Sequence, residues 1–127
     1  MNIDRSQVIT QVIKDAEKQE QTLGLIAARR YDAEIGGVEF NGIQLNTERD
    51  SQGLILGAAL EAFMDADYHV NWKTPGGFIS LDASMVLLIA KTIRAHVQAC
   101  FDREAALIAA VESGTYTDAM LDEGWPT

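Results

Sequence analysis

The sequence predicts an α+β fold in which three helices alternate with two antiparallel hairpins, in the order α-ββ-α-ββ-α. Three observations support this prediction. Long segments carry an apolar residue every three or four positions, two short segments alternate apolar and polar residues, and turn residues divide each alternating segment. A chain of 127 residues is long enough for one domain with one hydrophobic core.

The first helix is predicted over residues 4–31, with Asp4 as the N-cap. An apolar stripe runs along both of its halves. The stretch "EKQEQT" (17–22) between them is wholly polar. This polar middle indicates that the first half of the helix projects away from the core.

The apolar stripe of this helix has a seven-residue spacing. Ile9, Ala16 and Leu23 are seven apart, and Val12 is fourteen residues from Ile26. Such spacing is typical of a coiled coil that docks on a partner or on copies of itself. An amphipathic helix packed on its own domain is the alternative interpretation.

The first hairpin is predicted over "GGVEFNGIQLN" (36–46), because its Asn-Gly pair suits a type I′ turn. With a two-residue turn, Phe40 faces Ile43 and Val38 faces Leu45. All four apolar side chains then lie on one face of the hairpin.

The second helix is predicted from residue 48 to about residue 66. Thr47 and Asp50 resemble a capping box at its start. Gly53 and Gly57 share one helix face and each costs about 1 kcal/mol relative to alanine, so a close approach of another element is the expected compensation. The predicted buried side consists of Leu54, Ala58 and the run from Leu60 to Met64.

The second hairpin is predicted within "DYHVNWKTPGGFISL" (67–81), with its turn at Pro-Gly-Gly. The expected pairs are Lys73 with Phe78, Trp72 with Ile79, and Val70 with Leu81. In this register Phe78 lies on the polar face beside Lys73. Phe78 is therefore an isolated exposed aromatic, a core residue under a helix, or a binding anchor.

The third helix is predicted to begin after Asp82 and to end near Gly114. A short turn is expected within residues 117–127. The predicted buried stripe of the helix consists of Val86, Ile89, Ala90, Ile93, Val97, Cys100, Phe101 and Ile108.

The composition narrows the classes of partner. The net charge of −9 argues against nucleic acid and anionic membranes, which attract clustered Lys and Arg. A single cysteine allows no intrachain disulfide, which fits a reducing compartment. The first residues show no signal peptide, and the longest apolar run (85–90) is too short to span a bilayer.

No catalytic, cofactor-binding or metal-binding residues are predicted. His96 and Cys100 are four apart on the third helix, but structural zinc usually needs four nitrogen or sulfur ligands. Cys100 lies on the apolar stripe, where a thiol is inert. The charged segment around Arg94 indicates either a helix surface with ion pairs or a partner-binding surface.

Three segments together carry a family resemblance: "NGIQLNTERDSQ" (41–52), "VNWKTPGGFISLDAS" (70–84) and "RAHVQACFDREA" (94–105). They resemble a domain of unknown function found in phage and prophage tail-region proteins, within or beside tail fibre and tail-fibre-assembly proteins. The resemblance covers residues 27 to 125. It divides the chain into an N-terminal helical extension (1–26), for docking or oligomerisation, and a single α+β domain (27–127).

The resemblance implies a non-enzymatic, protein-binding role, either as a built-in tail or fibre component or as an assembly helper. The implied partner is a tail fibre or baseplate protein, with a homo-oligomer through the N-terminal helix as an alternative. The implied location is the host cytoplasm during assembly and, for a built-in component, the virion tail. A second hypothesis is an acidic decoy that inhibits a host nucleic-acid-binding enzyme. The candidate partner-binding residues are Ile9, Val12, Ala16, Leu23, Lys73, Phe78 and Arg94.

Overall fold

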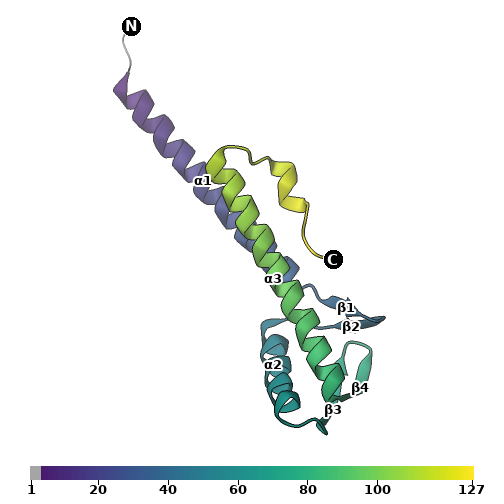
Figure 1. Cartoon of the computed structure of the whole chain (residues 1–127). Helices are drawn as coiled ribbons and strands as arrows, with labels where there is room; N and C mark the ends of the chain where they lie inside the picture. The colour runs from purple at the N-terminus through teal and green to yellow at the C-terminus, as the bar shows by residue number, and fades with distance from the viewer. Residues whose placement is uncertain (1–3) are drawn as a thin grey trace.

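The computed structural model describes residues 4–127 and confirms the predicted α+β class and element order (Figure 1). The elements are α1 (Arg5–Glu34), β1 (Val38–Phe40), β2 (Ile43–Leu45), α2 (Arg49–Met64), β3 (His69–Thr74), β4 (Gly77–Asp82), α3 (Ala83–Ser113) and the 3-10 helix η1 (Asp118–Asp122).

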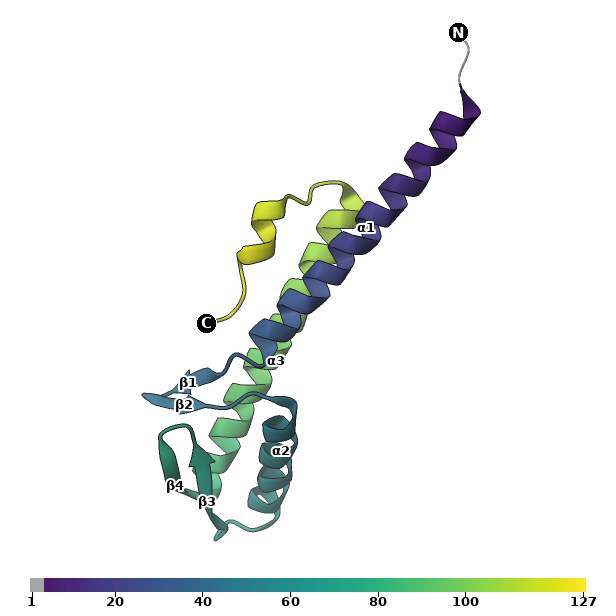
Figure 2. The ribbon, with the colours of Figure 1, turned by 180° about the vertical axis from the view of Figure 1, so that it is seen from behind.

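Helix α3 is the central element, and both of its predicted ends are confirmed. The Asp82 carboxylate accepts a hydrogen bond from the Met85 backbone N–H at 2.9 Å. Gly114 ends the helix in the left-handed conformation, with φ of 77°. Figures 1 and 2 show α1 lying along the C-terminal half of α3, while α2 and the hairpins lie beside its N-terminal half.

Helix α1 packs on α3 only through its second half. Residues 4–21 are exposed, and the first fully buried side chain is Ile26. Figures 1 and 2 show the N-terminal part of α1 extending beyond every other element. The projection expected from the polar segment 17–22 is therefore present.

Both hairpins have the predicted registers. In the first, Phe40 pairs with Ile43 and Val38 with Leu45, across Asn41 (φ 48°) and Gly42 (φ 80°). The positive φ angles are those that a type I′ turn requires. The second hairpin pairs Lys73 with Phe78, Trp72 with Ile79, and Val70 with Leu81. The hairpins form two separate two-stranded sheets.

The core lies where α2, α3 and the hairpins meet. Its buried side chains come mostly from α3, and partly buried residues of both hairpins, including Phe40 and Trp72, pack against it. The buried members are Leu45, Ile55, Ala58, Ala62, Leu81, Ala83, Val86, Ile89, Ala90, Ile93 and Val97. On α3, Phe101 was expected in this stripe but is 37% exposed, and Leu107 is buried instead.

The predicted buried side of α2 is largely wrong. Leu54, Leu60, Phe63 and Met64 are 60–81% exposed, and the buried residues are Ile55, Ala58 and Ala62. Two small alanines on the inner face let α2 lie close to α3. Because nearly every side of α2 is apolar, its sequence pattern did not single out the contacting face.

The predicted close approach at Gly53 and Gly57 is also wrong within this chain. A Cβ atom added at either glycine would meet no atom within 4 Å. Both glycines are exposed. Among residues 4–127, no close neighbour of the kind expected from their low helix propensity therefore lies at either glycine.

The predicted cap at Thr47 is wrong as well, because its hydroxyl serves a different purpose. Thr47 is fully buried, donates to the Glu34 carbonyl oxygen at 2.6 Å and accepts from the Gly37 N–H at 2.9 Å. Helix α2 begins one residue further on, and its N-cap Glu48 makes no side-chain capping bond. Thr47 therefore ties the end of α1 to the hairpin that follows it.

Candidate functional site

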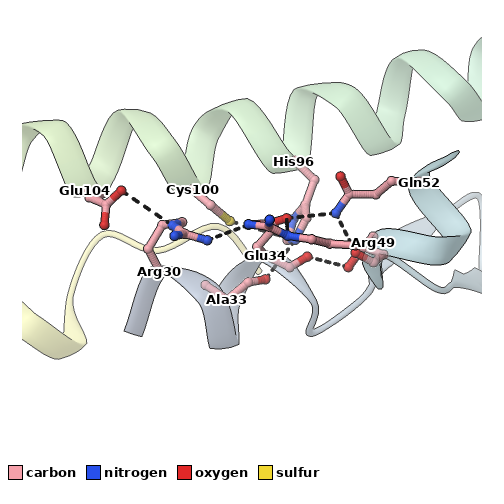
Figure 3. Close-up of polar contacts among 9 residues, drawn as sticks. Arg30, Ala33, Glu34, Arg49, Gln52, His96, Cys100 and Glu104 are labelled. Atoms are coloured by element: carbon pink, nitrogen blue, oxygen red, sulfur yellow. Dashed lines mark hydrogen bonds and ion pairs between the residues drawn. The ribbon is translucent and has the colours of Figure 1, made fainter. Parts of the chain in front are cut away.

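The most concentrated group of polar contacts surrounds the Glu34 carboxylate at the end of α1 (Figure 3). This carboxylate accepts hydrogen bonds from Arg30 Nη1 at 2.6 Å, Arg49 Nε at 3.2 Å and Gln52 Nε2 at 3.0 Å. Glu34 itself is only 1% exposed. A buried carboxylate with three side-chain partners is well satisfied.

The Glu34 cluster, defined by Arg30, Glu34, Arg49, Gln52, His96 and Glu104, also reaches α3. Arg30 Nε lies 3.5 Å from the Glu104 carboxylate, and the Arg30 guanidinium lies 4.5 Å from the centre of the Phe101 ring. His96 Nε2 donates to the Ala33 carbonyl oxygen at 2.9 Å. The cluster thus joins α1, α2 and α3 at the point where the elements meet.

The electrostatics of the cluster favour a charged Glu34. Burial by itself raises the pKa of Glu34. The hydrogen bonds from Gln52, Arg49 and Arg30 and the positive charge of Arg49 lower this pKa by a larger amount. The net result is a pKa below the ordinary value. The carboxylate therefore remains ionised between the two guanidinium groups at neutral pH.

Cys100 and His96 form a contact in the core of this region. The Cys100 sulfur lies 3.9 Å from His96 Nε2 and is fully buried. Burial and the charge of Glu34 raise the pKa of the Cys100 thiol. The thiol is therefore protonated at neutral pH, as the sequence interpretation of an inert core cysteine requires.

No group of three or more His, Cys, Asp or Glu among residues 4–127 is placed to hold a metal ion. None of the helices described here combines the length and apolar character needed to cross a membrane.

A groove of about 410 Å³ lies between α2 and α3, beside the Glu34 cluster. Its apolar lining includes Ile55, Ile93 and Val97, whereas Arg49 and Arg94 contribute basic groups. Arg94, one of the predicted partner-binding residues, is exposed at this groove.

A second groove of about 600 Å³ separates α2 from the second hairpin. It is lined by Leu54, Trp72, Pro75 and both predicted hairpin residues, Lys73 and Phe78. Phe78 is 71% exposed, so the interpretation of Phe78 as a core residue is wrong.

We expect Phe78→Ala to leave the melting temperature nearly unchanged, because a ring that is 71% exposed contributes little to packing. Thermal unfolding followed by circular dichroism measures this. A destabilisation of about 3 kcal/mol or more would mean that the ring is buried in solution. If the ring anchors a partner, the same variant binds that partner at least tenfold more weakly.

The outer side of α2 is the main feature that the sequence analysis missed. Leu56 is 62% exposed, Leu60 60%, Phe63 81% and Met64 65%. Together with Gly53 and Gly57 they form one continuous side of the helix, named here the α2 apolar face. The seven-residue spacing of Gly53 and Leu60, repeated by Leu56 and Phe63, is the sequence signal that could have identified it.

The free half of α1 carries the remaining predicted residues. Ile9 and Val12 are 59% and 63% exposed, and Ala16 is exposed as well. Leu23 is partly buried, because α1 already approaches α3 there. The predicted residues therefore occupy three separate surfaces. One is the stripe along α1, the second is formed by Lys73 and Phe78 on the second hairpin, and the third is at Arg94 on α3.

The comparisons with known proteins identify one family. A family model described as "Domain of unknown function (DUF4376)" matches residues 16–123. No curated protein and no solved structure matches the chain. The match covers most of the 127 residues and begins on α1, ten residues before the buried Ile26. The chain therefore belongs to the DUF4376 family of domains of unknown function.

Proposed function

We propose that the protein is a non-enzymatic protein-binding module of a phage or prophage tail. It acts either as a component built into the tail or fibre or as a helper in tail-fibre assembly. The observation that carries the binding role is the free half of α1, which presents uncovered apolar side chains on a projecting helix.

The free half of α1 has the form of a docking helix. Val8, Ile9, Val12 and Ile13 are 49–63% exposed and lie within one side of the helix. Burying such a stripe against a partner removes apolar area from water, and an amphipathic helix in a groove is a common mode of recognition. Ala16 continues the stripe toward the packed half.

The tail context is supported by the resemblance of the three segments at residues 41–52, 70–84 and 94–105. The implied partner is a tail fibre or baseplate protein. Synthesis in the host cytoplasm suits both the component and the helper. Because the chain has a net charge of −9, it would attract a partner with a basic surface through long-range electrostatic forces.

The test uses the full-length chain with an affinity tag in phage-infected or prophage-induced cells. We expect co-purification of a tail fibre or baseplate protein. The double variant Ile9→Glu, Val12→Glu should lose at least tenfold in recovery, because two charges interrupt the apolar stripe. The matched control is Gln7→Glu, Gln11→Glu, which adds the same charge on the opposite side of the same exposed helix.

Equal recovery with both double variants would exclude α1 as the docking element. Recovery of a host nucleic-acid-binding enzyme in place of a tail protein would favour the decoy hypothesis. Mass spectrometry of purified virions separates the two tail roles: a built-in component is present at stoichiometric copy number, whereas an assembly helper is absent.

A further inference from the structure

We propose that the groove between α2 and β3 binds an extended peptide segment of a partner protein, which adds as a strand to the free edge of β3. This groove of about 600 Å³ is named here the β3 groove. The inference goes beyond the proposed function, because it assigns a second binding site and a different structural element of the partner. It uses none of the residues of α1.

Strand β3 has one strand neighbour and one free edge. The second hairpin is a two-stranded sheet, so β3 pairs with β4 on one side only. In an antiparallel pair, alternate residues of each strand direct their N–H and C=O groups away from the partner strand. Along β3 these groups form a row of donors and acceptors that no other strand among residues 4–127 uses. An extended peptide backbone matches the spacing of this row.

The β3 groove follows this free edge. It is lined by six consecutive residues, 70–75, whereas β4 contributes only Phe78. Successive side chains of a strand point to opposite faces, so a groove bounded by every residue in turn lies beside the edge of the strand. Figure 2 shows β3 on the side of the hairpin nearer to α2. The opposite wall of the groove, formed by Ser51 and Leu54, belongs to α2.

The walls of the groove favour a single segment over a second copy of the chain. Residues 70–75 of a strand span about 17 Å, which is the length of about five or six peptide residues. A second copy would offer its own β3, but that edge faces its own α2 across the same groove. The two α2 helices would therefore obstruct pairing of the edges, whereas one extended segment needs only the width of one strand.

The lining of the groove sets the side chains that the segment carries. Leu54, Trp72 and Phe78 offer apolar surface, and Leu54 and Phe78 are 66% and 71% exposed. Lys73 is the one charged residue among the ten described residues that line the groove. Among residues 4–127, no carboxylate forms an ion pair with Lys73. The segment therefore carries apolar side chains and a single Asp or Glu beside Lys73.

A single carboxylate at Lys73 is compatible with the net charge of −9. At physiological ionic strength, exposed charges more than about 8 Å apart are largely screened from one another. The charge inside the groove, that of Lys73, therefore sets the preference of the site. Burial of Leu54 and Phe78 and the backbone hydrogen bonds supply the remaining affinity.

Selection from a random library of eight-residue peptides, displayed on yeast, against the full-length chain tests the proposal. We expect enrichment of peptides that alternate apolar residues and carry one Asp or Glu. The dissociation constant of a selected peptide is then measured by fluorescence anisotropy. Lys73→Glu should weaken binding at least about tenfold, because an attractive contact becomes repulsive. The control Lys91→Glu makes the same change on an exposed site of α3 and should bind like the wild type.

A second pair of variants tests the opposite wall. Leu54→Asp places a carboxylate in the groove and should also weaken binding at least about tenfold, because apolar side chains of the peptide would meet a charge there. Leu60→Asp makes the same change on the same helix but outside the groove, and should leave binding unchanged. The two leucines are 66% and 60% exposed, so both variants should keep the circular dichroism spectrum of the wild type.

Ester substitution in the peptide distinguishes a bound strand from any other conformation. Replacing a peptide amide with an ester removes the N–H donor without adding bulk. Esters at the alternate positions that face β3 should weaken binding at least about tenfold, because two or more hydrogen bonds are lost. Esters at the other alternate positions should leave the dissociation constant nearly unchanged.

The absence of any enriched peptide would overturn the proposal. So would a peptide that binds Lys73→Glu and Leu54→Asp as tightly as the wild type, or one that both ester series weaken equally. A wild-type mass of twice 13.9 kDa that Leu54→Asp returns to 13.9 kDa would make a second copy the occupant and would also overturn it. None of these results affects recovery of a tail protein through Ile9 and Val12, so the two proposals can fail separately.

Discussion

Replacing Glu34 with glutamine is expected to lower the free energy of unfolding by about 3–5 kcal/mol. The substitution preserves the shape of the side chain but removes the negative charge that contacts both Arg30 and Arg49. Arg30 is itself mostly buried, and after the substitution its guanidinium would keep only the Glu104 carboxylate, 3.5 Å from Nε, as a counter-charge among the described residues. Urea unfolding followed by circular dichroism measures the change.

The control for this variant is Glu39→Gln, which makes the same chemical change on an exposed strand position. We expect a change of less than about 0.5 kcal/mol there. If Glu34→Gln unfolds like the wild type, the cluster does not hold α1, α2 and α3 together.

We also expect the difference in unfolding free energy between the wild type and Glu34→Gln to depend on pH. The pKa of Glu34 is lower in the folded chain than its ordinary value of 4.5. The stabilisation is therefore complete above the ordinary value and is lost as the pH falls through the folded pKa. The difference in unfolding free energy between wild type and Glu34→Gln should accordingly shrink below about pH 4.

Ile55→Ala is expected to lower the free energy of unfolding by about 2–5 kcal/mol, because Ile55 is 2% exposed and its truncation leaves a cavity in the core. Leu56→Ala, one residue further along the same helix, should change it by less than about 0.5 kcal/mol, because Leu56 is 62% exposed. Both variants are compared with the wild type by urea unfolding under the same conditions.

This adjacent pair tests the orientation of α2 directly. Equal losses at both positions would place Leu56 in the core and would remove the α2 apolar face as a surface.

The sequence by itself determined the parts of the fold that depend on neighbouring residues. The Asn41-Gly42 turn, the Pro-Gly-Gly turn and the caps at Asp4 and Asp82 were all predicted. In each case the local backbone requirement is met by only a few residue types. A tight turn then fixes the register of its hairpin, so the strand pairs were predicted too.

The tertiary structure alone decided which surfaces are covered. Helix α2 is apolar on nearly every side, and only its packing on α3 shows that Ile55, Ala58 and Ala62 face inward. The roles of Thr47 and Glu34 also depend on the tertiary structure, because their hydrogen-bond partners lie up to 18 residues away along the chain. Burial and long-range hydrogen bonds depend on which elements meet in space, and no local pattern of residues specifies that meeting.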